Sequence, residues 1–150
     1  MAKGVDIRPL RREDEVEWRR LWTDYLTFYE TKLPEDVYRS TFERLLSGGE
    51  GEFRALVAVA DGRTVGLTHY LLHRSNWSID NICYLQDLYA DPEVRGRGIG
   101  RALIEAVYIN ARNEGAAKVY WMTQEFNDTA RALYDRLAVK SPFVVYQNPL

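Results

Sequence analysis

The stretch that decides the fold runs from Tyr84-Leu85-Gln86-Asp87-Leu88-Tyr89-Ala90 to Arg95-Gly96-Arg97-Gly98-Ile99-Gly100. Its first part predicts a strand over 82–89, and apolar residues at helical spacing predict a helix that follows the glycines. Glycines at such a turn let successive backbone N–H groups face one way, and the helix adds the positive end of its dipole. The sequence therefore predicts an anion cradle sized for a pyrophosphate, flanked by three cations: Arg95, Arg97 and Arg101.

Two familiar phosphate-binding motifs do not fit this turn. A P-loop requires Lys-Ser or Lys-Thr after its last glycine, but Arg101-Ala102 follows here. A dinucleotide fingerprint requires two residues between its second and third glycines, but only Ile99 separates Gly98 from Gly100. Three spaced glycines alone are equally compatible with a tight turn that exposes arginines, so the neighbouring sequence has to decide.

Outward from the turn, hairpin signals coexist with a strand–helix–strand unit. Asp61-Gly62 is a strong hairpin signal between two apolar runs, and Gly48-Gly49 ends a helix. We expect an α/β fold in layers with a mixed sheet, formed as a single domain over 1–150. The expected strands cover 5–10, 53–60, 64–72, 82–89, 118–122 and 143–146, and the expected helices start near residues 12, 34 and 100 and cover 128–137.

The bulk composition argues against several classes of protein. Lys+Arg number 20 and Asp+Glu number 22, a formal charge of −2, which lacks the basic excess typical of nucleic-acid binders. Cys83 has no second cysteine to pair with, and we expect it to be a small buried hydrophobe. With one cysteine and only two histidines, we expect no metal site. We find no apolar run long enough to predict a secretory signal or a membrane span, so we expect a cytoplasmic protein.

The turn and its neighbours resemble the GNAT superfamily of N-acetyltransferases. Arg95-x-x-Gly98-x-Gly100 resembles the signature Gln/Arg-x-x-Gly-x-Gly/Ala, and residues 84–90 are similar to the splayed strand whose backbone pairs with pantetheine. Farther on, Asn127, Ala130, Leu133 and Tyr134 match the Asn-x-x-Ala-x-x-Leu/Phe-Tyr helix of that family. The resemblance implies a central mixed, mostly antiparallel sheet flanked by helices. It also implies direct acetyl transfer from acetyl-CoA to a primary amine.

The same resemblance implies where coenzyme A binds and which residue acts as the acid. Tyr134 would protonate the departing sulfur, because a tyrosine is protonated at neutral pH; the alternative is a core tyrosine on an amphipathic helix. Ala138 replaces the glycine that usually follows this tyrosine, which we interpret as a local variation. The implied cofactor-binding residues are Leu88, Tyr89, Ala90, Arg95, Gly96, Arg97, Gly98, Ile99, Gly100, Arg101, Asn127 and Ala130.

On the acceptor side, the chain is similar to the diamine and polyamine acetyltransferases and their bacterial relatives. Tyr84-Leu85-Gln86-Asp87 resembles their Tyr-Leu-Glu-Asp, Phe126-Asn127-Asp128 resembles Trp-Asn-Glu, and Tyr29-Glu30 resembles a Tyr-Glu pair near their substrate groove. Gln86 cannot accept a proton usefully, so Asp87 becomes the candidate catalytic base, with Glu30 or Glu125 acting through water as alternatives. The implied substrate-binding residues are Tyr29, Glu30, Gln86 and Asp87.

Several questions stay open at the level of sequence. The acceptor is a polyamine, an amino acid, an antibiotic or a protein amine. A non-catalytic acyl-CoA sensor would use the same cradle, although Asn127 and Tyr134 together argue against it. His69 and His73 are interpreted as ordinary strand residues on one face. The apolar terminal segment 143–146 predicts an edge strand, and family members of this type often pair there, so we expect a homodimer.

Overall fold

The computed structural model describes residues 4–94 and 96–150 and contains one five-stranded sheet in the order β1-β2-β3-β4-β5. Neighbouring strands from β1 to β4 pair antiparallel, whereas β5 lies parallel to β4. The predicted mixed, mostly antiparallel sheet is therefore confirmed. The strands are β1 (Val5–Pro9), β2 (Arg54–Ala60), β3 (Arg63–His73), β4 (Ile82–Ala90) and β5 (Val119–Tyr120).

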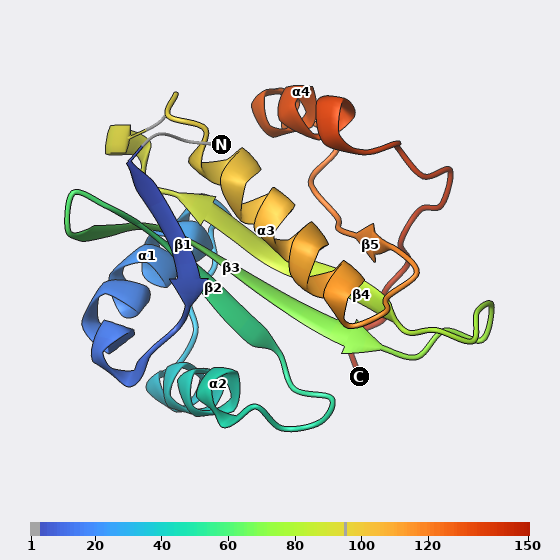
Figure 1. Ribbon diagram of the computed structural model, residues 1–150, viewed down its shortest axis with the longest axis horizontal. Helices are drawn as coiled ribbons and strands as arrows, with labels where there is room; N and C mark the ends of the chain where they lie inside the picture. The colour runs from blue at the N-terminus through green and yellow to red at the C-terminus, as the bar shows by residue number, and fades with distance from the viewer. Residues whose placement is uncertain (1–3, 95) are drawn as a thin grey trace.

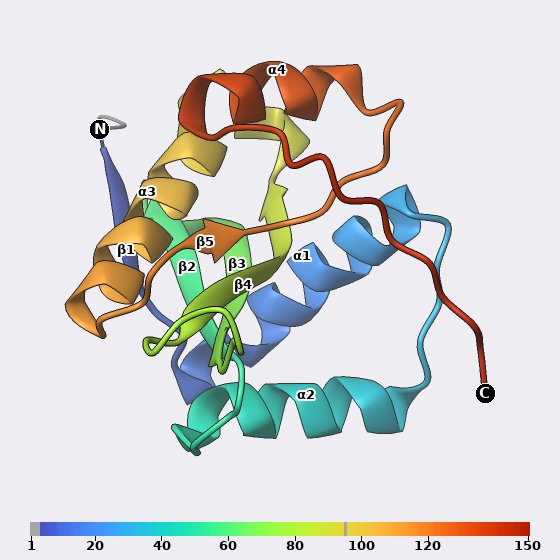
Figure 2. The ribbon, with the colours of Figure 1, turned by 90° about the vertical axis from the view of Figure 1, so that its right-hand side faces the viewer.

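Helices cover both faces of this sheet, as Figures 1 and 2 show: α1 and α2 lie on one face and α3 on the other. A 3₁₀ turn (Arg12–Asp14) precedes α1, and a second one (Pro92–Val94) follows β4. Gly48 ends α2 in the left-handed conformation that glycine adopts without steric cost. The helices are α1 (Glu15–Phe28), α2 (Glu35–Ser47), α3 (Ile99–Asn113) and α4 (Asp128–Leu137).

Each face of the sheet carries its own apolar core. On the α1/α2 face, Trp18 is fully buried, stacks on Trp22 at 5.1 Å between ring centroids and contacts Phe42 at the same distance. On the other face, Leu103 and Val107 of α3 are fully buried against the sheet. Because both faces are covered, the central strands read as nearly continuous apolar runs.

The sheet opens between β4 and β5. Pairing between them is limited to Cys83 with Val119 and Tyr84 with Tyr120, after which β4 continues to Ala90 without this neighbour. The register between β3 and β4 also shifts at Gln86, because His69 lies opposite Asp87 while Tyr70 lies opposite Leu85. Such a bulge re-aims side chains, and here it turns both Gln86 and Asp87 toward the α1/α2 face.

Two predictions about the C-terminal part are corrected. The strand expected over 118–122 is only Val119–Tyr120, and no strand forms over 143–146, where Phe143 to Tyr146 are 66–93% exposed. A strand needs a neighbour for its backbone N–H and C=O groups, and the segment finds none within one chain. Among the described residues, no helix is long and apolar enough to cross a membrane.

Candidate active site

The glycine turn leaves backbone donors free at the start of α3. Gly96 and Gly98 have φ angles of 85° and 74°, a region that side chains rarely adopt, and Gly98 is the N-cap of α3. The first N–H groups of a helix have no intrahelical partner, and no side chain of a described residue caps this end. The geometry fits the predicted anion cradle. Arg95 lies outside the described residues.

The side-chain cations beside the cradle are already engaged. Arg97 forms an ion pair with Asp61 at 3.5 Å, and Arg101 bonds to Glu105 at 2.6 Å within the same helix. Both acids are exposed to solvent, so these pairs screen the cations without fixing them. Backbone N–H groups and the helix dipole are consequently the main source of positive potential at this turn.

Helix α4 borders the opening between β4 and β5 and passes over the start of α3. A Cβ on Gly100 would lie 3.6 Å from Leu133 of α4. Asn127 caps α4: its side-chain oxygen accepts from the N–H of Ala130 at 3.4 Å, and its amide donates to Thr123 Oγ1 at 3.4 Å. Asn127 and Tyr134 are therefore fixed relative to each other by α4, which begins at Asp128 as the sequence predicted.

Tyr134 lies in an apolar setting next to this opening. Its ring contacts Trp121 edge-on at 5.4 Å between centroids. Burial, with a smaller contribution from Tyr29, raises the pKa of Tyr134 to about 12. Tyr29 is the C-cap residue of α1, so the end of α1 and the middle of α4 meet here although they are far apart in the sequence. The phenol of Tyr134 stays protonated at neutral pH and can donate a proton.

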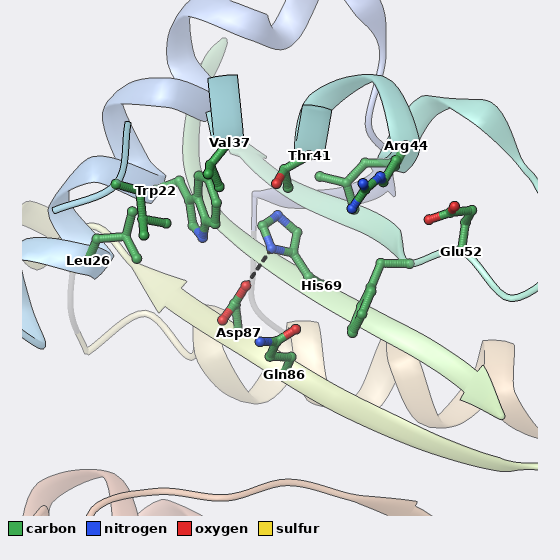
Figure 3. Close-up of a pocket in the computed structure, with 12 residues that line it drawn as sticks. Trp22, Leu26, Val37, Thr41, Arg44, Glu52, His69, Gln86 and Asp87 are labelled. Carbon is green, nitrogen blue, oxygen red and sulfur yellow. Dashed lines mark hydrogen bonds and ion pairs between the residues drawn. The ribbon is translucent and has the colours of Figure 1, made fainter. Parts of the chain in front are cut away.

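A pocket of about 340 Å³ opens on the α1/α2 face of the sheet (Figure 3). We call it the acceptor pocket. Apolar walls come from α1 and α2, and polar groups are contributed by α2, by the segment before β2, by β3 and by β4. The polar and charged side chains that line it are Thr41, Arg44, Glu52, His69, Gln86 and Asp87.

Asp87 is the buried carboxylate of this pocket, with 8% of the residue exposed. Its Oδ2 lies 2.7 Å from His69 Nδ1. Burial by itself raises the pKa of Asp87, but interactions with His69, Tyr25 and Trp22 together outweigh burial and hold it below the ordinary aspartate value. The indole nitrogen of Trp22 makes no acceptable hydrogen bond within the described part of the chain, so its effect on Asp87 is a longer-range one. Asp87 is thus ionised at neutral pH.

The other predicted acceptor residues divide into two groups. Gln86 lines the acceptor pocket, and Tyr29 interacts with Asp87, with Thr123 and with Tyr134. Glu30 is exposed in the turn after α1, with a φ of 55°, and it does not line the pocket. Glu125 is exposed as well. The structure therefore brings Tyr29, Gln86 and Asp87 together and leaves the two glutamates outside.

Sequence reasoning missed residues that surround Asp87. His69 was interpreted as an ordinary strand residue, yet it is buried and contacts the carboxylate directly. The available signal is a stripe of polar-tipped aromatic residues at helical spacing along α1 and its C-cap: Trp18, Trp22, Tyr25 and Tyr29. Cys83 is fully buried as expected, and burial raises the pKa of its thiol to about 11, which argues against a nucleophilic role.

Comparison with known proteins identifies relatives along nearly the whole chain. A sequence profile of the acetyltransferase (GNAT) family matches residues 16–138. The D-amino-acid N-acetyltransferase HPA3 of Saccharomyces cerevisiae is 34% identical over 145 residues, covering 96% of this chain and 90% of the relative. The thialysine N-epsilon-acetyltransferase of Mus musculus is 32% identical, covering 89% and 83%. In fold, the chain is similar to AAC(6')-Iy bound to a bisubstrate analog, with a TM-score of 0.84, 21% identity and coverage of 97% and 98%.

Proposed function

The chain belongs to the GNAT family of acetyltransferases, and from this premise we propose that it transfers acetyl from acetyl-CoA directly to the primary amine of a small acceptor. The observation that carries the proposal is Asp87, an ionised carboxylate buried at the acceptor pocket on the α1/α2 face. Tyr29 interacts both with this carboxylate and with Tyr134 on α4, so an amine beside Asp87 is near a proton donor.

The glycine turn fits the pyrophosphate of coenzyme A. Bound acetyl-CoA supplies an acetyl thioester as the electrophile. We propose that the N–H groups from Arg97 to Arg101 bind the phosphates, with Gly96 giving the backbone close access. The pairing of β4 with β5 is limited to Cys83 with Val119 and Tyr84 with Tyr120, and we propose that the later part of β4, over residues 88–90, binds the pantetheine arm through its backbone. Asn127 and Ala130, at the start of α4, would lie near the thiol end.

Replacing Gly98 by aspartate should weaken acetyl-CoA binding by about tenfold or more, because it adds a Cβ in a left-handed position and a negative charge at an anion site. Gly115→Asp is a matched control: Gly115 also has a positive φ, 79°, but it lies at the opposite end of α3. Calorimetry on both folded variants measures the difference. Equal affinities of the two variants for acetyl-CoA would contradict the proposed cradle.

For the acceptor, we propose an amino acid. Arg44 lines the acceptor pocket and forms no ion pair with any described residue, so it is available to a carboxylate, while Asp87 is available to an amine. Asp87 can hold the ammonium of a zwitterion and Arg44 its carboxylate, whereas a polyamine would place a second cation beside Arg44. Glu52 is the remaining acid of the pocket. The names of two relatives, a D-amino-acid and a thialysine acetyltransferase, are consistent with this choice.

The test is an acetyl-CoA turnover assay with mass-spectrometric detection of products. Each amino acid, in both enantiomers, is compared with the amine that lacks its carboxylate, and polyamines and a peptide amine complete the panel. We expect acetylation with higher kcat/KM for the amino acid of each pair. Preference for the decarboxylated amine would contradict the amino-acid proposal. Acetyl-CoA binding without turnover of any amine would favour the alternative, a non-catalytic sensor.

We further propose a homodimer that buries the C-terminal segment. Phe143, Val144, Val145 and Tyr146 are exposed in the single chain, and Phe143 contacts Trp77, which is itself 86% exposed. Light scattering should give about twice the chain mass of 17.5 kDa, and removal of residues 141–150 should halve it. A monomer at high protein concentration would contradict the proposal. Unchanged mass after the truncation would show that the contact lies elsewhere.

A further inference from the structure

A buried chain of hydrogen bonds leads from α1 to the carboxylate of Asp87. Trp18 on α1 is fully buried, and His69 on β3 is 2% exposed. The indole N–H of Trp18 bonds to His69 Nε2 at 3.0 Å, and His69 Nδ1 lies 2.7 Å from Asp87 Oδ2. Residue Asp87 belongs to the acceptor pocket, whereas Trp18 does not line it. Neither distance involves a group in solvent, so both bonds are made in a low-dielectric setting.

The chemistry of the three groups fixes where the protons are. An indole nitrogen only donates, so Nε2 of His69 must accept and therefore carries no proton. The single proton of the neutral ring then resides on Nδ1, which donates to the carboxylate of Asp87. Adding a second proton to the ring would set two N–H groups against each other between side chains that are both buried. The order of donors thus makes His69 a fixed donor and excludes it as a base.

We propose that His69 is a positioning residue: the chain Trp18 to His69 to Asp87 holds the carboxylate ionised and oriented toward the amine in the acceptor pocket. This inference rests on the proposed acetyl transfer. One carboxylate oxygen is held by His69, so the rotamer of Asp87 is set from the core side and its charge is presented to the acceptor pocket. A histidine beside an aspartate would otherwise suggest a general base, and Trp18 is what rules out that role.

Other titratable and charged groups surround the hydrogen bonds from Trp18 to Asp87. Tyr25 of α1, Tyr29 just after it and Tyr84 of β4 interact with Asp87. Burial raises the pKa of each of these phenols, so they are neutral at physiological pH. Arg44 and Glu52 line the same pocket from α2 and from the segment before β2. No other described residue offers a hydrogen-bond donor to Asp87 Oδ2 in place of His69, so losing His69 should change the orientation of the carboxylate.

Nuclear magnetic resonance of the ring nitrogens tests the proton positions without any assay of activity. The chain has only two histidines, His69 and His73, so assignment needs one His73→Gln variant. We expect His69 to show the Nδ1–H tautomer at neutral pH, with Nε2 resonating as an unprotonated acceptor. In Trp18→Phe, Nε2 loses its donor, so its chemical shift should change while Nδ1 keeps its proton. An Nε2–H tautomer or a doubly protonated His69 ring in the wild-type protein at neutral pH would overturn the proposal.

Two amide variants test the positioning role itself. The side-chain nitrogen of asparagine can occupy the place of Nδ1 and donate to Asp87, whereas that of glutamine reaches only the place of Nε2. His69→Asn should therefore keep kcat within about threefold of wild type, and His69→Gln should lose about tenfold or more with little change in acetyl-CoA affinity. Equal kcat values in the two folded variants would overturn the role. Should both fail to fold, the kcat of Trp18→Phe decides: it should fall by about threefold or more with little change in acetyl-CoA affinity, and an unchanged kcat would overturn the role.

Discussion

Replacing Asp87 by asparagine should lower kcat/KM by about 10²- to 10³-fold, the usual cost of removing one preorganised charge-stabilising group from an active site. Asparagine has the same shape, and its amide oxygen still accepts from His69 Nδ1, so the buried hydrogen-bond chain survives. What disappears is the negative charge at the pocket. The loss should fall on kcat and on the KM of the acceptor, while the affinity for acetyl-CoA stays within a few fold.

The direction of the pKa shift decides which role Asp87 has. A primary alkylammonium has an ordinary pKa of about 10 and an aspartate one of about 4, so proton transfer between them is uphill by about 8 kcal/mol. The interactions with His69, Tyr25 and Trp22 lower the pKa of Asp87 further and widen this gap. Asp87 is therefore a poor base for an ammonium ion. Its strength is charge: it attracts the amine and stabilises the positive charge that develops on nitrogen during attack.

This distinction is visible in the pH profile. With Asp87 ionised throughout the neutral range, the rise of kcat/KM with pH follows the ionisation of the acceptor amine. The asparagine variant should consequently have a lower plateau and an unmoved acidic limb. The control is Glu30→Gln, which removes an exposed carboxylate in the turn after α1 and should change kcat/KM by less than about twofold. If Asp87 were the titrating base, its acidic limb would disappear in the asparagine variant.

The sequence predicted the features that depend on neighbours in the chain. The bounds of α4, 128–137, are those expected, because the Asn127 cap and the apolar spacing that follows it are local signals. The glycines of the turn demand particular backbone angles, and Gly96 and Gly98 adopt them. Local chemistry therefore sufficed for the cradle and for the helix that bears Tyr134.

Features that depend on distant contacts could not be predicted in the same way. Trp18 and His69 are 51 residues apart, and His69 approaches Asp87 only after β3 and β4 pair with a bulge at Gln86. A regular strand would send residues 86 and 87 to opposite faces, so no alternation pattern indicates that both line one pocket. The strand predicted over 143–146 was wrong for a related reason. The apolar pattern of this segment is that of a strand, but a strand needs a neighbour to pair with, and the described residues of one chain do not provide it.

Replacing Tyr134 by phenylalanine should lower kcat by roughly ten- to a thousandfold, near the usual contribution of a general acid. The ring keeps its contact with Trp121. Within the described part of the chain, the Tyr134 hydroxyl has no hydrogen-bond partner, so its removal should leave the melting temperature almost unchanged. The affinity for acetyl-CoA should stay within about a few fold, because a proton delivered to the departing sulfur contributes to the transition state and not to ground-state binding.

The raised pKa of Tyr134 also predicts the shape of the pH profile of the phenylalanine variant. With its pKa raised to about 12, Tyr134 remains protonated over the whole range in which activity is measured. Its titration therefore does not shape the high-pH limb below about pH 10, and the profiles of wild type and Tyr134→Phe should have the same form at different heights. A limb that vanished in the variant would mean that bound substrate brings this pKa down into the neutral range.

Tyr108→Phe is the matched control for packing. Tyr108 contacts the same Trp121 ring at 6.3 Å, and its hydroxyl donates to the carbonyl of Leu137 in α4 at 2.9 Å. Its loss should cost about 1 kcal/mol of stability and leave kcat intact. The two variants thus exchange phenotypes: Tyr134→Phe loses turnover and keeps stability, whereas Tyr108→Phe does the reverse. Near wild-type turnover in a folded Tyr134→Phe enzyme would mean that water protonates the sulfur, and Tyr134 would then be a core residue of α4.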